Sequence, residues 1–167
     1  MPIETPTQNE RHTLLERGRI YYGTLLDLAG PTDYVTDLER LVHSTGNRVY
    51  TLTFPNYDRH IDGELREGTT LVSFGTPRRS PPLMMTFGQT WTSLSGDAYF
   101  VGRKHGVPNY SPRLWEGENK HLREHPVEAP RDAFLSRIHL IVFKPDENRI
   151  VLADVGRNPI NFYEREF

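Results

Sequence analysis

Two pairs of alternating polar residues lie in the second half of the chain. Ser93 and Ser95 are two positions apart in the segment WTSLS, and Glu164 and Glu166 are two positions apart near the C-terminus. Because successive side chains of a strand point to opposite faces, each pair would present both members on one face. Two carboxylates beside a cleft raise each other's pKa and can orient a hydroxyl group. The alternative interpretation is a pair of strands that each have one polar face.

A second candidate for chemistry is the segment HLREH, which begins at His121 and ends at His125. It matches the H-x-x-E-H pattern of zinc enzymes, in which two histidines of one helix bind the metal and the glutamate, here Glu124, acts as base. Pro126 follows directly, so the motif would lie at the end of a short helix, where a histidine also suits the helix dipole. We therefore expect no metal in this protein.

Other candidate residues have both a functional and a plain interpretation. His43 and His139 could be the two histidines of a phosphoesterase, although the second is not followed by the hydroxyl residue of such motifs. The segment GRKHG, residues 102–106, could form an anion-binding turn. TPRRSPP, residues 76–82, could contact a phosphate or a peptide through its two arginines. Both basic segments also suit a solvated loop.

The order of the serine and glutamate segments resembles that of the mono-ADP-ribosyltransferase toxins of the Arg-Ser-Glu class. In that family an N-terminal strand carries an arginine that binds NAD, a Ser-Thr-Ser strand supports the nicotinamide pocket, and a late Glu-x-Glu strand carries the catalytic glutamate. The resemblance implies NAD as the cofactor and a toxin or effector function. It assigns Arg19 to the pyrophosphate, with Arg78, Arg79 and Arg103 as substitutes, and Ser93 to the nicotinamide ribose. Ser95 would also bind the cofactor, and Tyr99 or Phe100 would stack nearby. Glu166 would bind the ribose 2′-hydroxyl as the catalytic residue, and Glu164 would orient the acceptor.

A non-catalytic binding protein is the alternative function. An inhibitor, an immunity-type protein or a viral assembly protein would act through exposed residues of its loops. Arginine and aromatic residues dominate such surfaces, so Tyr110, Trp115, Arg78 and Arg79 are the candidates. In either interpretation the expected partner is a protein.

The composition is typical of a soluble globular protein. The 167 residues suit a single domain over residues 1–167, and the absence of cysteine excludes disulfides and thiolate metal sites. The formal net charge of -2 provides no basic excess for binding duplex nucleic acid. No apolar run is long enough to span a bilayer, and no classical signal peptide is visible. We expect a soluble protein made in the cytoplasm, which leaves open export by a route that uses no such signal.

The N-terminal part is predicted to hold the helices. A Thr-x-x-Glu capping box precedes a helix over residues 8–17, which Gly18 is expected to end. Strand-forming residues follow over 19–26, and apolar residues at helical spacing predict a second helix over 34–44.

The rest of the chain is predicted to form mostly antiparallel strands. The shorter predicted strands cover residues 48–54, 69–74, 84–87, 98–101 and 160–167. A long irregular segment over 103–131 contains one short helix near 113–124. Apolar runs at 137–143 and 149–155 flank a turn and predict a hairpin that supplies the most buried strands. The prediction is an α+β fold with N-terminal helices and a mostly antiparallel sheet, either continuous or split.

Overall fold

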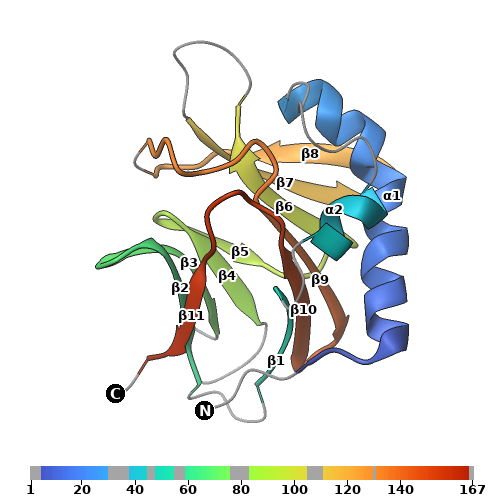
Figure 1. Ribbon diagram of the computed structural model, residues 1–167, viewed down its shortest axis with the longest axis horizontal. Coiled ribbons are helices and arrows are strands. Elements are labelled where there is room, and N and C mark those ends of the chain that lie inside the picture. Colours follow the sequence, from blue (N-terminus) through green and yellow to red (C-terminus); the bar gives the residue numbers. More distant parts are fainter. Residues whose placement is uncertain are drawn as a thin grey trace.

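The chain folds into two antiparallel sheets that face each other, with a long helix on the outer face of one of them (Figure 1). The computed structural model describes residues 5–29, 38–44, 48–54, 59–75, 83–104, 111–129 and 131–165. The predicted combination of helices with mostly antiparallel strands is confirmed. Within these described ranges, no helix has both the length and the apolar character needed to cross a membrane.

The larger sheet, sheet A, has the strand order β1-β10-β9-β6-β7-β8. Its strands are β1 (Val49–Thr53), β6 (Ala98–Arg103), β7 (Pro112–Glu118), β8 (His121–His125), β9 (Leu140–Asp146) and β10 (Arg149–Asp154). Sheet B has the order β11-β2-β3-β4-β5. Its strands are β2 (Ile61–Arg66), β3 (Thr69–Gly75), β4 (Met84–Phe87), β5 (Thr90–Ser93) and β11 (Asn161–Glu164).

Sheet A is covered on both faces. Leu140 and Val142 of β9 belong to the core shared with sheet B, whereas Ile141 and Phe143 belong to the core shared with the helices. A strand buried on both faces has a continuous apolar run rather than an alternating pattern. This explains why the predicted hairpin of β9 and β10 is confirmed: its sequence signal is the strongest in the chain.

Helix α1 (Gln8–Ala29) corrects the prediction for the N-terminal region. The capping box is confirmed, because the Thr7 amide donates to Glu10 Oε1 at 3.0 Å and the Glu10 amide donates to Thr7 Oγ1 at 3.1 Å. The predicted helix end at Gly18 and the predicted strand over 19–26 are wrong, since the helix continues through both.

Gly18 permits a close helix contact instead of ending a helix. A Cβ atom at this position would lie 2.4 Å from Cδ2 of Leu38 in α2 (Leu38–Ser44). Leu14, Tyr21 and Leu25 continue the buried stripe of α1 on either side of it. Of the second helix predicted over 34–44, the structure contains the last seven residues as α2. Residues 30–37 lie outside the described part of the chain.

The short helix predicted near residues 113–124 is also wrong, because this segment is the antiparallel pair β7 and β8. Asn119 and Lys120 form the turn between them, with φ values of 51° and 66°. Positive φ at both central residues suits the twist of a tight hairpin. The hairpin extends sheet A beyond β6 and makes β8 an edge strand.

Candidate functional site

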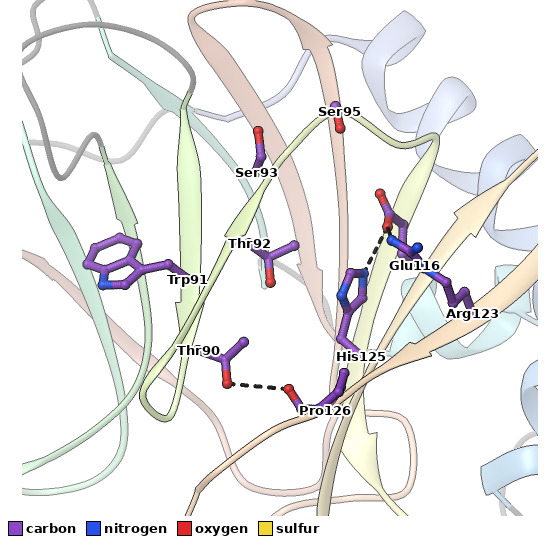
Figure 2. A pocket seen from close by; sticks show the side chains of 9 residues that line it. All are labelled: Thr90, Trp91, Thr92, Ser93, Ser95, Glu116, Arg123, His125 and Pro126. Carbon is purple, nitrogen blue, oxygen red and sulfur yellow. Dashed lines mark hydrogen bonds and ion pairs between the residues drawn. The ribbon is translucent and has the colours of Figure 1, made fainter.

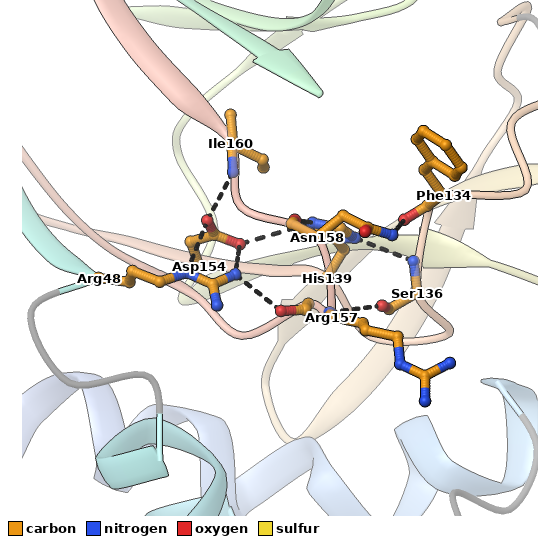
Figure 3. Close-up of polar contacts among 9 residues, drawn as sticks. Arg48, Phe134, Ser136, His139, Asp154, Arg157, Asn158 and Ile160 are labelled. Carbon is orange, nitrogen blue, oxygen red and sulfur yellow. Dashed lines mark hydrogen bonds and ion pairs between the residues drawn. The ribbon is translucent and has the colours of Figure 1, made fainter. Parts of the chain in front are cut away.

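Two loops, the one before β9 and the one after β10, meet at the end of sheet A where β6 also ends (Figure 3). Val101 and Asp154 both pair with Leu140, which places the residues beyond these positions next to one another. A Cβ atom on Gly102 would lie 1.9 Å from the carbonyl oxygen of Arg137, so the loop before β9 rests directly on the end of β6. Four basic residues lie here, two at the end of β6 and two on these loops, and we call them the basic loop cluster: Arg103, Lys104, Arg137 and Arg157.

His139 connects the loop before β9 with the loop after β10 through hydrogen bonds. Its side chain is fully buried, Nδ1 accepts a hydrogen bond from the Ser136 amide at 2.9 Å, and Nε2 lies 2.8 Å from the carbonyl oxygen of Asn158. An amide can only donate and a carbonyl can only accept, so the partners define a neutral ring with its proton on Nε2. Burial lowers the pKa of His139 despite the opposing effect of Asp154, which agrees with the neutral form.

A buried ion pair supports the loop after β10. Asp154 is fully buried and accepts hydrogen bonds from Arg48 Nε at 3.1 Å and from the Ile160 amide at 2.8 Å. Arg48 also donates to the carbonyl oxygen of Gly156 at 2.7 Å. Figure 3 shows these contacts beside His139. The loop is therefore held at both its beginning and its end.

The carboxylates at this end of sheet A already have cationic partners. Arg48 binds Asp154, and Arg66 binds Asp132 at 3.1 Å while its guanidinium lies 4.0 Å from the centre of the Phe134 ring. Arg137 forms no ion pair with a described residue, and its Nε is buried without a hydrogen-bond partner. A guanidinium whose charge no described carboxylate offsets favours an incoming anion.

Ser136 adds a hydroxyl group to the same place. Its oxygen accepts a hydrogen bond from the Arg157 amide at 2.9 Å, and no residue of the described ranges accepts its hydroxyl hydrogen. The Asn158 side chain donates to the carbonyl oxygen of Phe134 at 2.9 Å, which ties the two loops together beside it. The arrangement is thus a rigid loop surface that offers donors and positive charge.

Among the described residues that the resemblance assigns to NAD, Ser93 and Glu164 lie far apart. Ser93 ends β5 and Glu164 ends β11, and these strands are the two edges of sheet B. Three strands separate them, which corresponds to roughly 19 Å at about 4.8 Å per strand. Glu164 forms an ion pair with Arg59 at 3.3 Å. Glu166 lies outside the described residues.

Arg19 and Tyr99 also have other surroundings than the resemblance implies. Arg19 is exposed on α1 and forms an ion pair with Glu39 of α2. Tyr99 is fully buried, so its ring is not available to stack on a ligand. Its hydroxyl accepts hydrogen bonds from the backbone amides of Ser95 and Gly96. It faces two acceptors, the carbonyl oxygen of Ser93 and Oε1 of Glu116. Burial and its contact with Glu116 raise the pKa of Tyr99 to about 12.

The histidine motif lies on an edge strand rather than at a helix end. His121 is exposed at the start of β8, and His125 binds Glu116 at 2.8 Å. Glu124 forms an ion pair with Arg113 at 3.0 Å, on the other side of the strand. In the described part of the chain, no group of three histidine or acidic residues is arranged to bind a metal.

The remaining candidate residues are dispersed. Trp115 is buried against the helices, so its predicted role as an exposed contact is wrong. His43 is exposed on α2, and His139 is the buried support described above. Tyr110, Arg78 and Arg79 lie outside the described residues.

Sequence reasoning identified one part of the basic loop cluster and missed the others. The segment GRKHG, which contains Arg103 and Lys104, was expected to be either an anion-binding turn or a solvated loop. Ser136, Arg137 and Arg157 were missed, although they directly flank the predicted hairpin. Loop residues at the ends of confidently predicted strands are the signal that could have found them.

No family model, curated protein or solved structure matches this chain.

Proposed function

We propose that this protein is a non-catalytic binding module that recognises a phosphorylated side chain of a partner protein through the basic loop cluster. A phosphoryl group carries about -1.5 to -2 charges at neutral pH and three strong acceptor oxygens. Guanidinium groups bind such oxygens in pairs, and a hydroxyl can donate to the third. Arg137 and Ser136 offer such groups at one end of sheet A, and Arg103 and Arg157 add positive charge beside them.

The main support for the proposal is that buried residues hold these loops in a fixed conformation. His139 and the Arg48–Asp154 pair hydrogen-bond the backbone of the two loops. These loops carry Ser136, Arg137 and Arg157. A surface that is ordered before binding loses less conformational entropy when the partner arrives. Recognition of phosphorylated segments by arginine clusters is a recurring mode of peptide binding.

The position of the cluster favours a segment of a protein over a small metabolite. Lys104 and Arg157 are exposed, and the loops lie at one end of sheet A. Loops held by a rigid scaffold are where binding proteins carry their contacts. The NAD interpretation has weaker support, because Ser93 and Glu164 lie on opposite edges of sheet B.

Binding to phosphorylated peptides tests the proposal. Fluorescence anisotropy would compare labelled peptides that contain phosphoserine, phosphothreonine or phosphotyrosine with their unphosphorylated forms. We expect binding of a phosphorylated set only, with an affinity that falls as salt is added. Arg137→Gln should weaken binding by at least about tenfold, the loss of roughly one charge-assisted hydrogen bond.

The matched control is Arg19→Gln, which removes one exposed arginine from α1. This variant should bind the phosphorylated peptides as the unmodified protein does. Equal binding of phosphorylated and unphosphorylated peptides would contradict the proposal, as would full affinity in Arg137→Gln.

A further inference from the structure

A hollow lies between the two sheets, away from the basic loop cluster (Figure 2). Its volume is about 470 Å³, which lies in the range of about 300–1,000 Å³ that is typical of small-molecule sites. The edge strand β5 of sheet B forms one wall, and the edge strand β8 of sheet A forms the other. Glu116 of β7 lies between the walls.

Glu116 gives this hollow a charged but balanced wall. Its Oε1 accepts a hydrogen bond from the Tyr99 hydroxyl at 2.9 Å, and its Oε2 accepts from Arg123 at 2.9 Å and from His125 at 2.8 Å. Burial alone would raise the pKa of Glu116, but the bonds from His125, Tyr99 and Arg123 hold it below the ordinary value. Glu116 is therefore a carboxylate whose charge Arg123 offsets, so the site selects neither anions nor cations.

Two polar atoms beside the hollow, Thr92 Oγ1 and His125 Nδ1, have no hydrogen-bond partner among the described residues. Thr92 is 6% exposed, and its buried hydroxyl has no hydrogen-bond partner. His125 uses Nε2 for Glu116, and no residue of the described segments bonds its Nδ1. In Figure 2 the Thr92 side chain points from β5 toward His125, and the Ser95 side chain lies at one end of the same space. A buried hydroxyl without a partner costs stability, which a ligand can recover.

We infer that this hollow binds a neutral, hydroxyl-rich small molecule, a sugar or polyol. The hydroxyls of Thr92 and Ser95 can both donate and accept, as the hydroxyls of such a ligand can. His125, whose Nε2 faces Glu116, adds a second ring nitrogen, Nδ1, that can hydrogen-bond a ligand, and the balanced Glu116–Arg123 pair leaves no net charge to attract an ion. This inference does not depend on the proposed recognition of phosphorylated side chains.

Titration with glucose, galactose, maltose and myo-inositol tests the inference. Calorimetry would detect binding and give the affinity, since the Trp91 ring points away from the other side chains that line the hollow (Figure 2) and is no suitable reporter. We expect at least one of these four probes to bind saturably at millimolar concentrations. Inorganic phosphate should not displace it, because the balanced Glu116–Arg123 pair leaves no net positive charge to attract an anion.

Thr92→Val provides the sharpest variant, because it keeps the side-chain shape and removes the orphaned hydroxyl. It should weaken binding by about tenfold, as should Ser95→Ala at a more exposed position. Thr51→Val is the matched control: Thr51 also has a buried hydroxyl without a partner, but it lies on β1 at the opposite edge of sheet A. This control should bind the probe normally.

Three outcomes would overturn the inference. The first is that none of the four probes binds saturably to the unmodified protein, which would leave a hollow filled by water. The second is normal affinity in both Thr92→Val and Ser95→Ala, with melting temperatures confirming that both variants are folded. The third is displacement of the probe by phosphate, which would show that the site is selective for anions.

Discussion

The most deeply buried ionisable residues stabilise the loops at one end of sheet A. His139 and Asp154 are completely buried, and each accepts or donates hydrogen bonds with the backbone of a loop. A buried polar group must find partners within the protein, because water cannot reach it. These residues thus fix the loops that carry Arg137 and Arg157 of the basic loop cluster, and any binding function depends on them indirectly.

His139 is expected to make the stability of the protein depend on pH. The folded protein holds this ring neutral, and burial lowers its pKa. An unfolded chain binds a proton on histidine near pH 6.5, so below that pH the unfolded state binds more protons than the folded state. The free energy of unfolding therefore falls as the pH falls, by at most about 1.4 kcal/mol per pH unit.

Urea unfolding between about pH 7.5 and about pH 5 measures this effect. His139→Gln should be less stable at neutral pH, because it loses the fitted ring, but its stability should change less with pH. His43→Gln is the control, since His43 is an exposed residue of α2. Its pH profile should follow that of the unmodified protein. Parallel profiles for all three proteins would show that His139 does not cause the pH dependence.

Residues that act through local spacing could be predicted from the sequence, and residues that act through distant contacts could not. The capping box of Thr7 and Glu10 is confirmed because both partners lie within one turn. Glu116 was missed, since its partners Tyr99 and His125 come from other strands. The pairing of β7 with β8 creates this contact, and no spacing within the chain indicates it.

At the scale of elements, α1 docks on sheet A through a contact that requires glycine. A Cβ atom on Gly117 would lie 2.4 Å to 2.8 Å from three ring atoms of Tyr21. Both residues are buried, and the Tyr21 hydroxyl is held by Asp97 at 2.8 Å. The ring therefore cannot move aside easily, and β7 must present a bare backbone to the helix.

Gly117→Ala should lower the free energy of unfolding by about 1–3 kcal/mol, because it overpacks this contact. Gly23→Ala is a matched change on the same helix, where a Cβ atom would meet nothing within 4 Å. It should raise the free energy of unfolding by roughly 0.5–1 kcal/mol through helix propensity. Denaturant titration of both variants checks the signs. A stabilising Gly117→Ala would mean that α1 does not lie on β7 as described.

The elements that could be predicted are those whose sequence pattern reflects their burial. The hairpin of β9 and β10 has apolar residues on both faces, and this run has few other interpretations. β7 and β8 carry Glu116, Arg123 and His125 on the side that faces the hollow, so no apolar alternation marks them as strands. The turn at Asn119 and Lys120 also lacks the glycine that commonly indicates a tight hairpin.

At the scale of the whole molecule, sheet A carries two cores. Leu152 belongs to the core between the sheets, and Ile141 belongs to the core under the helices. These residues lie on neighbouring strands but point to opposite faces of the sheet, since Ile141 pairs with Ala153 and Leu152 pairs with Val142. The two layers therefore share one sheet, and loss of either core should destabilise the other.

Ile141→Ala and Leu152→Ala should each lower the free energy of unfolding by about 2–5 kcal/mol, the usual cost of a cavity at a fully buried site. Both variants should also unfold in one transition, because each cavity weakens the sheet that both cores share. Trp115 fluorescence, measured with Trp91 replaced by Phe, would report on the helix layer, and circular dichroism would report on the whole fold. We expect the two signals to coincide in both variants. Separate transitions, with the fluorescence changing first in Ile141→Ala, would show that the helix layer unfolds on its own and would contradict the prediction of a single domain.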